Sequence, residues 1–222
     1  MTLDEFRHRN RISEDDWIKS ECDWDVLKAI GADHTANHDQ LVTTAEMFAR
    51  TIQRISGVHY VRFGVKDAEH LLEKIVRKCA VHVEKYRAIT VQNYHGVVTD
   101  LVGIRALHLF KNDCFQIDEG IRSNWPLAEA PTAYVRAGDP EEFRQSLRER
   151  GLDVKEHGAG YRSVHYVATS QPGMRKVSVE IQVRTIFEEG WSEIDHKIRY
   201  PNFSDNALIG YFLAIFNGRL SR

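Results

Sequence analysis

Cysteine is scarce in this 222-residue chain, and neither sign of charge is in clear excess. The cysteines, Cys22, Cys79 and Cys114, stand far apart and form no Cys-x-x-Cys pair, which indicates free thiols in a reducing compartment and no structural zinc. Thirty basic residues face thirty-two acidic ones, so the global positive charge of a DNA-binding protein is absent. An anion site must therefore arise from local clusters of cations.

Several functional signatures are missing as well. No apolar run is long enough to span a bilayer, and the charged stretch "MTLDEFRHRNRISEDDW" is no signal peptide, so we expect a cytoplasmic protein with no membrane partner. The phosphate-binding pattern GxxxxGK[ST] is absent, which excludes a P-loop enzyme. No Ser-His-Asp spacing indicates a hydrolase, and no His/Cys set indicates zinc.

The apolar spacing predicts both helices and strands. Hydrophobic residues make up 42% of the chain, which is enough for one domain with additions. We expect helices over 13–30, 38–55, 67–85, 139–151 and 186–200, and strands over 102–110, 132–137, 163–170 and 177–183. Strands mixed with helices favour an α/β or α+β fold in which helices cover a sheet.

The stretch "VSVEIQV" at 177–183 alternates between apolar and polar residues, as a half-buried strand does. Its polar face, which carries Glu180 and Gln182 and continues to Arg184, is either an ordinary wetted sheet face or the floor of an active site.

A basic stripe runs along the helix expected over 67–85. Lys66, His70, Lys74 and Lys78 follow each other at intervals of four, with Arg77 beside them. Such a row suits phosphate groups, because several cations must converge on them. Nearby Glu69 and Glu73 favour a solvated charged face as the interpretation of the stripe taken alone.

Two further stretches place polar groups at strand ends. Asp100 stands at the entrance to the buried strand that holds Arg105, where it is either a turn residue or a metal ligand. If this strand neighbours 177–183, Asp100 and Glu180 can share Mg²⁺, which takes one or two carboxylates plus substrate phosphates. In "GAGYRSVHY", glycines precede Tyr161, which can serve as a stacking platform for a base.

Taken together, "DLVGIR", "GYRSVH" and "VEIQVRT", followed by "DHKIRY", resemble the synthetase domain of the RelA/SpoT family of alarmone synthetases over roughly 55–200. The resemblance implies a nucleotidyltransferase-like fold with a mixed, mostly five-stranded sheet flanked by helices. We expect a helical extension over 1–55, a synthetase domain over 56–200 and the start of a C-terminal helical segment over 201–222. Because this last segment stops after a strongly apolar stretch, a piece of a longer chain and a whole chain are both open.

This resemblance implies a GTP diphosphokinase-type enzyme that moves the β,γ-pyrophosphate of ATP to the 3′-hydroxyl of GDP or GTP with Mg²⁺. Asp100 would bind the metal, and Glu180 would be the base for the hydroxyl or a second carboxylate near the metal. Arg105 and Arg62 would stack on adenine, and Tyr161 on the acceptor base. The full ATP side comprises Arg62, Lys66, His70, Lys74, Arg77 and Arg105, and the acceptor side Tyr161, Arg162, His165, Gln182 and Arg184.

Departures from the family pattern leave the acceptor open. Arg62 precedes Lys66 by four residues instead of two, His70 replaces a usual serine, and Ala159 stands at the asparagine of guanine-specific members. A toxin of the same family, which modifies adenosine nucleotides or the 3′-CCA end of tRNA and has an antitoxin partner, is the second hypothesis. A catalytically silent nucleotide-binding module is the third. The hydrolase domain of long members would need much more upstream sequence, so we do not expect hydrolysis, and a C-terminal regulatory domain cannot be read from this chain.

Overall fold

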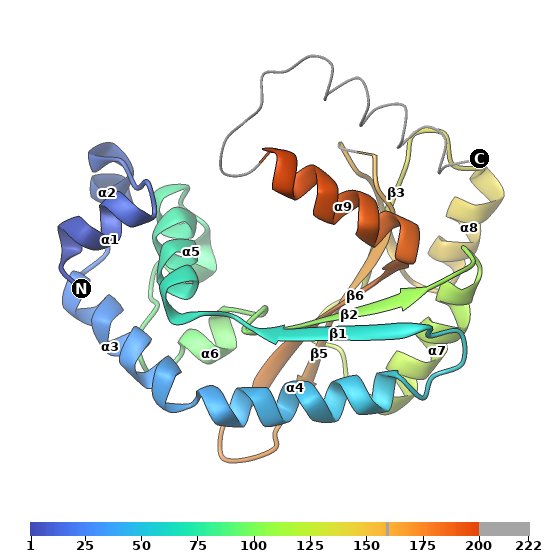
Figure 1. The fold of residues 1–222 in the computed structure, drawn as a ribbon, viewed down its shortest axis with the longest axis horizontal. Helices are drawn as coiled ribbons and strands as arrows, with labels where there is room; N and C mark the ends of the chain where they lie inside the picture. Colours follow the sequence, from blue (N-terminus) through green and yellow to red (C-terminus); the bar gives the residue numbers. More distant parts are fainter. Residues whose placement is uncertain (159, 200–222) are drawn as a thin grey trace. The chain divides into compact units, whose positions relative to one another are not determined.

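The computed structural model describes residues 1–158 and 160–199, with side chains described as far as residue 194. Figure 1 shows its elements along the chain. The helices are α1 (Leu3–Arg9), α2 (Glu14–Ser20), α3 (Trp24–Ala36), α4 (His38–Ile52), α5 (Ala68–Ala80), η1 (Glu84–Tyr86), α6 (Tyr94–Val97), α7 (Asp113–Asn124), α8 (Glu141–Glu149) and α9 (Ile186–Arg199). The strands are β1 (Tyr60–Val65), β2 (Val102–His108), β3 (Thr132–Val135), β4 (Asp153–Glu156), β5 (Ser163–Ser170) and β6 (Val177–Thr185).

The strands form one mixed sheet in the order β1-β2-β6-β5-β3-β4. Strand β3 pairs in parallel with β4 and antiparallel with β5. The predicted fold class is confirmed, but the sheet has six strands where five were expected. Strands β1 and β4 escaped sequence analysis because most of their residues are exposed, so neither shows apolar alternation.

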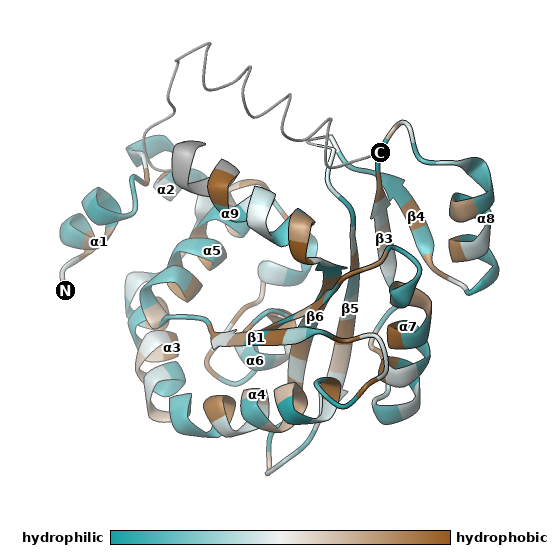
Figure 2. Cartoon of the chain, turned by 45° about the vertical axis from the view of Figure 1, so that its right-hand side comes forward, coloured by the Kyte–Doolittle hydropathy of each residue, from teal (hydrophilic) through white to brown (hydrophobic). Residues whose placement is uncertain are grey.

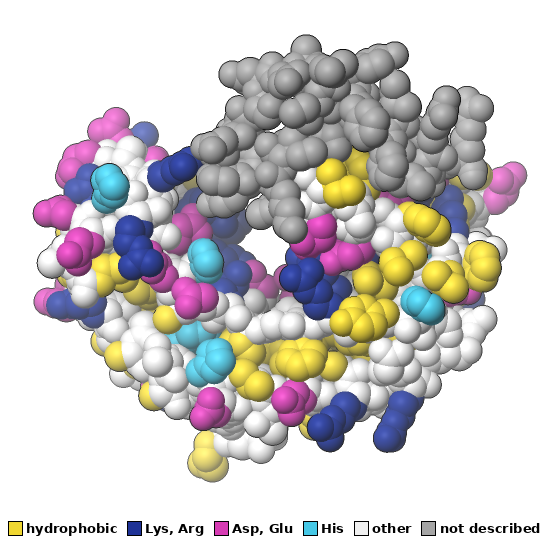
Figure 3. Space-filling model, viewed as in Figure 1, with side chains coloured by type: hydrophobic (Ala, Val, Ile, Leu, Met, Phe, Trp, Pro, Cys, Tyr) yellow, Lys and Arg dark blue, Asp and Glu magenta, His cyan; other side chains and the backbone are white. Residues whose placement is uncertain are grey.

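Contacts within the chain divide it into two compact units, and each is described by itself. The first unit comprises residues 1–48, 63–103 and 168–180. Here α2 and α3 pack against α5, which presents an apolar stripe at helical spacing. The buried cluster of this unit consists of Phe6, Leu27, Ile30, Leu71, Leu72, Ile75, Val76, Cys79, Tyr86, Tyr94, Val98 and Leu101. On the outer surface of α1 and α2, acidic and basic side chains are mixed (Figure 3).

The helix expected over 13–30 is in fact two helices, so that prediction was wrong. Helix α2 ends where Glu21 adopts φ 52°, in the left-handed region. Asp23 then caps α3, because its side chain accepts hydrogen bonds from the backbone N–H groups of Asp25 and Val26. Apolar periodicity continues across this break, which is why spacing alone did not reveal it.

The second unit comprises residues 49–62, 104–167 and 181–222. Its buried residues come from both faces of the strands and from the inner sides of α7 and α8. Hydrophobic colouring dominates β5 and β6, whereas bands of both kinds alternate along α8, as expected of an amphipathic helix (Figure 2). Inside this unit, the buried Tyr166 hydroxyl donates to Asp118, which Arg122 also contacts. No helix in the described ranges is both long enough and apolar enough to cross a membrane.

The predicted domain boundaries at residues 55 and 200 stay predictions. The helical segment expected over 201–222 lies outside the described residues.

The cap of α3 gives a stability prediction. Replacing Asp23 with alanine leaves two backbone N–H groups without their acceptor, and we expect a loss of about 1 kcal/mol in the free energy of unfolding. Asp23→Asn keeps a capping oxygen and should cost only a few tenths of that. Urea denaturation followed by circular dichroism measures both variants, and equal losses would contradict the capping role.

Candidate active site

Three charged side chains of the first unit converge on one another. The Nζ of Lys74 lies 2.6 Å from Oδ1 of Asp100, and the Nζ of Lys66 lies 3.2 Å from its Oδ2. All three side chains are mostly buried. Burial alone would raise the pKa of Asp100, but the hydrogen bonds and charges of Lys74 and Lys66 outweigh it and hold the pKa below its ordinary value. Asp100 is therefore an ionised carboxylate at neutral pH.

Backbone contacts hold Lys66 in position for this pair. Its N–H donates to the carbonyl of Leu101 at 2.8 Å, directly after Asp100 in the chain. Its carbonyl lies 2.7 Å from Nε2 of His34, which is buried in α3. The chain on both sides of Lys66 is thereby fixed, and its side chain extends from an anchored backbone.

The basic stripe divides into residues that join this cluster and residues that do not. Lys66 and Lys74 contact Asp100, whereas His70 lies on the exposed side beside Asp67, and Arg77 donates to Glu73 at 3.1 Å. Sequence spacing treated them alike, because residues four apart share a helix face only approximately. The predicted phosphate contacts of His70 and Arg77 stay predictions, and the structure gives both residues acidic neighbours.

The polar face of β6 is not an ordinary wetted sheet face. Val177, Val179, Ile181 and Val183 are all buried, as the alternation predicted. On the opposite face, Ser178 and Arg184 are buried too, while Glu180 and Gln182 are partly buried. Polar groups on both sides of Glu180 are thus shielded from bulk water, which strengthens their electrostatic interactions. Glu180 and Asp100 belong to the same unit.

In the second unit, two arginines meet on the acidic face of α9. Nη1 of Arg105 lies 2.7 Å from Glu189 and 2.5 Å from Glu193. Nη1 of Arg62 lies 3.4 Å from the same oxygen of Glu193. The shared carboxylate therefore brings together the two arginines that the resemblance placed on either face of adenine.

An aromatic group surrounds Tyr161. The rings of His157 and Tyr161 lie 3.8 Å apart between centroids, and the guanidinium carbon of Arg184 lies 5.6 Å from the Tyr161 ring. Burial, followed by the charges of His165 and Arg184, lowers the pKa of His157. A neutral imidazole and a cation thus flank this phenol ring. Arg184 in turn donates to Gln182 and lies 3.2 Å from Glu189.

His165 joins the same group from β5. Its ring lies 4.9 Å from that of Tyr134, which in turn lies 5.5 Å from His157. Three predicted acceptor residues, Tyr161, His165 and Arg184, are therefore neighbours in one constellation. Ala159 lies outside the described residues.

Arg162 is held by carboxylates that sequence analysis did not single out. Its Nε donates to both oxygens of Asp139 at 2.9 Å, and its Nη1 donates to Glu188 at 3.2 Å. Lys111 and the backbone N–H of Arg136 also donate to Asp139. The signal in the sequence was weak, because an aspartate before a proline is typical of a helix start and glutamates are typical of a first helical turn.

Mg²⁺ requires oxygen ligands, and the first unit supplies them. Asp100 offers an ionised carboxylate with cations beside it, and Glu180 offers a second carboxylate in the same unit. Among the described residues no group of three or more His, Cys, Asp or Glu side chains can hold a metal alone. The Mg²⁺ ligands predicted from the sequence stay a prediction.

Comparisons with known proteins decide the family. A model described as a region found in RelA/SpoT proteins matches residues 64–205. The chain belongs to the RelA/SpoT family. The family predicted from the three motifs is thereby confirmed.

Relatives of known name or structure agree. A curated protein named GTP pyrophosphokinase YwaC, from Bacillus subtilis strain 168, is 22% identical over 75% of this chain and 71% of its own length. That name carries the enzyme class predicted from the sequence. A GTP pyrophosphokinase family protein from Streptococcus pneumoniae is 21% identical with a TM-score of 0.56, over 82% of this chain and 84% of its own.

Small alarmone synthetase 1 from Bacillus subtilis shares the fold in two liganded forms. Bound to AMPCPP it has a TM-score of 0.52 at 19% identity, over 82% of this chain and 86% of its own. Bound to its product pppGpp it has a TM-score of 0.50 at 22% identity, over 86% and 88%. These likenesses show the fold.

The charge network around Asp139 predicts an acid-dependent stability. Burial would raise the pKa of Asp139, but Arg162, Lys111 and the N–H of Arg136 lower it far below its ordinary value of 3.8. Because the pKa is lowered in the folded state, Asp139 contributes fully to the free energy of unfolding above its ordinary pKa. This contribution is lost as the pH falls below that value.

We therefore expect Asp139→Asn to cost about 3 kcal/mol at neutral pH, the low end for breaking a buried pair, because Glu188 still compensates Arg162. Between about pH 5 and about pH 3 the wild type should lose stability more steeply than this variant. Urea denaturation across that range measures both slopes. Asp153→Asn, a change at an exposed position, is the control. If the stability of Asp139→Asn fell with pH as steeply as that of the wild type, the prediction would be contradicted.

Proposed function

We propose that this chain is a small alarmone synthetase that transfers the β,γ-pyrophosphate of ATP to the 3′-hydroxyl of GDP or GTP. The observation that carries the proposal is the convergence of Lys66 and Lys74 on an ionised, largely buried Asp100. Phosphoryl-type transfer needs positioning and neutralisation of charge more than covalent chemistry by the protein. Two fixed ammonium groups beside a carboxylate are suited to that task.

Lys66 and Lys74 bind the phosphates of ATP in this proposal. Their ammonium groups are already placed by Asp100 before a nucleotide arrives, so little rearrangement is needed when the phosphates add further negative charge. Asp100 would hold Mg²⁺, which when bound would supply positive charge to the phosphate oxygens. In the absence of nucleotide, the lysines keep the carboxylate compensated.

Arg62 and Arg105 bind the adenine base. Guanidinium groups are planar and stack on aromatic faces, and Glu193 holds both arginines close to one another. The carboxylates of α9 balance the positive charge of both arginines, which reduces the repulsion between the two guanidinium groups.

Tyr161 stacks on the acceptor base, with Arg184 beneath its ring. Glu180 accepts the proton of the 3′-hydroxyl as this oxygen attacks the β-phosphorus of ATP, and AMP leaves. The bond that forms joins the 3′-oxygen to the β-phosphorus, and the bond that breaks lies between the α- and β-phosphates.

The guanosine acceptor is supported by relatives alone: one carries the name GTP pyrophosphokinase, and another is described as bound to its product pppGpp. Ala159, in place of the family's asparagine, supports adenosine nucleotides or tRNA as the alternative acceptors, and an antitoxin would then be a partner. We place the protein in the cytoplasm, as the sequence predicts.

Transfer of labelled pyrophosphate tests the proposal directly. ATP with a label on its β- or γ-phosphate is incubated with GDP, GTP, AMP, ADP or deacylated tRNA, in the presence and absence of Mg²⁺. We expect label in the guanosine nucleotides and a rate about 10²–10⁴-fold lower in Glu180→Gln, because the general base is lost. Glu46→Gln, an exposed change on α4, is the control. Label in tRNA or adenosine nucleotides alone would replace the guanosine acceptor, and label nowhere would reject the synthetase.

A second prediction compares two lysines of α5, Lys74 and Lys78. Lys74→Met removes one cation from the phosphates and should lower kcat about 10²–10³-fold. Lys78→Met, one turn further along α5, makes the same substitution on the same helix and should retain most activity. Steady-state kinetics with varied ATP separate the two. Equal losses of kcat in the two variants would show that the charge of the whole basic stripe matters. The contact with Asp100 would then give Lys74 no special role.

A further inference from the structure

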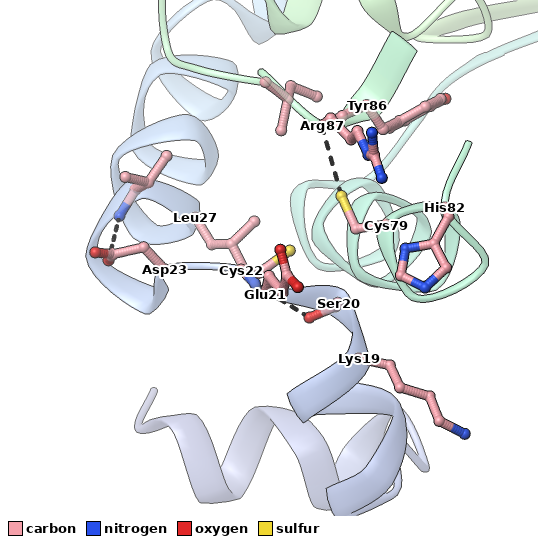
Figure 4. A pocket seen from close by; sticks show the side chains of 12 residues that line it. Lys19, Ser20, Glu21, Cys22, Asp23, Leu27, Cys79, His82, Tyr86 and Arg87 are labelled. Carbon is pink, nitrogen blue, oxygen red and sulfur yellow. Dashed lines mark hydrogen bonds between the residues drawn. The ribbon is translucent and has the colours of Figure 1, made fainter. Parts of the chain in front are cut away.

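A pocket of about 210 Å³ lies in the first unit, between the α2–α3 turn and the end of α5. Figure 4 shows Cys22 and Cys79 facing the same space from these two segments, while Lys19 points away from it. The proposed transfer reaction uses none of the residues that line this pocket. Its notable feature is a pair of cysteines that stand 57 positions apart in the chain (79 − 22).

The two thiols differ in access and in partners. Cys22 is partly exposed, whereas Cys79 is buried and its Sγ donates to the carbonyl of Tyr86 at 3.6 Å. Cys22 packs against the apolar cluster that contains Cys79. A small oxidant from solvent can therefore reach the sulfur of Cys22, whereas the sulfur of Cys79 is shielded from solvent.

Local backbone geometry holds both segments in place. Glu21, directly before Cys22, has φ 52°, and His82, which follows the end of α5, has φ 54°. The N–H of His82 donates to the carbonyl of Cys79 at 2.8 Å. Asp23, directly after Cys22, caps α3. Each cysteine therefore adjoins a helix end whose backbone is held in a defined conformation, and both line the same pocket.

The two thiols also differ in acidity. The neighbouring Cys79 thiol is the main cause that lowers the pKa of Cys22 to about 7, against burial, and the Ser20 side chain adds to it. The same contact and burial raise the pKa of Cys79. Burial raises the pKa of Cys114, in α7, to about 12. At neutral pH a thiolate is therefore concentrated on Cys22, and the thiolate is the nucleophile.

We propose that Cys22 and Cys79 form a reversible disulfide when the protein meets a hydroperoxide. The Cys22 thiolate attacks one peroxide oxygen, the O–O bond breaks, and the departing hydroxide takes a proton to become water, which leaves Cys22 as a sulfenic acid. The sulfur of Cys79 then attacks Cys22, the S–O bond breaks, and the hydroxide leaves as water with the proton of Cys79. Two thiols and one hydrogen peroxide thus give one disulfide and two waters, and a dithiol reductant reverses the bond.

This cross-link joins the α2–α3 turn to α5 and closes the long loop between the two cysteines. Closing a loop of this length restricts the unfolded chain and stabilises the fold. Lys74 lies on α5 as well, so the tie restrains the helix that the proposed reaction uses. Any effect on transfer rests on the proposed function, whereas the disulfide itself does not.

The first test treats the full chain with hydrogen peroxide and follows its thiols. We expect free thiols to fall from three to one, the intact mass to fall by two hydrogens, and a Cys22–Cys79 peptide to appear in a non-reducing digest. Dithiothreitol should restore all three thiols. The melting temperature should rise by an amount on the order of 5 °C on oxidation. Cys114→Ser should behave as the wild type in each measurement.

Loss of Cys114 at the same rate, disulfides between two chains, or no loss of thiols would each overturn the proposal.

The second test separates the attacking thiol from the resolving one. Cys79→Ser should react with peroxide and accumulate a sulfenic acid on Cys22, which dimedone traps. Cys22→Ser should leave Cys79 unmodified at the same peroxide dose. The opposite pattern, or equal labelling of both variants, would contradict the order of attack. If either variant fails to fold, brief oxidation of the wild type with dimedone present gives the same assignment, because the adduct must then map to Cys22.

Discussion

The ion pairs of Asp100 with Lys66 and Lys74 join three separate parts of the chain: the residue after β1, the middle of α5 and the turn before β2. Each charge is largely withdrawn from water, and each would be costly to bury alone. The backbone pairing of Lys66 with Leu101 and the contact with His34 fix where the lysine begins. Under the proposed function, phosphates that bind beside the carboxylate meet ammonium groups already held in place, so little entropy is lost in ordering the lysine side chains.

In the second unit, too, partly buried charges are held by partners of opposite sign. Here arginines are the numerous charges, and carboxylates of α9 hold them: Glu189 and Glu193 contact Arg105, and Glu189 also contacts Arg184. Because guanidinium groups of like charge repel, a shared carboxylate is what allows two of them to stand together. A ligand that stacks between such arginines need not displace their carboxylates, since stacking uses the faces of the guanidinium and ion pairing uses its edges.

Sequence analysis predicted what depends on short-range pattern and missed what depends on distant partners. The alternation of β6 was readable because every second residue is apolar, whereas β1 has no such alternation, since most of its residues are exposed. Spacing could not tell Lys74 from His70, because only the position of Asp100 distinguishes them. Asp139 gains its meaning from Arg162, 23 residues later, and no local motif signals that pairing. The break at Asp23 depends on a side-chain cap, which periodicity does not measure.

The adjacent motif residues Tyr161 and Arg162 have different surroundings, so one short stretch can serve two tasks. The ring of Tyr161 has His157 and Arg184 as neighbours. Arg162 has five N–H donors, and carboxylates engage its Nε, Nη1 and Nη2. An acceptor contact by Arg162 would have to use the N–H groups that Asp139 and Glu188 leave over. Its larger contribution is to hold the start of β5, and with it Tyr161, against the buried acids.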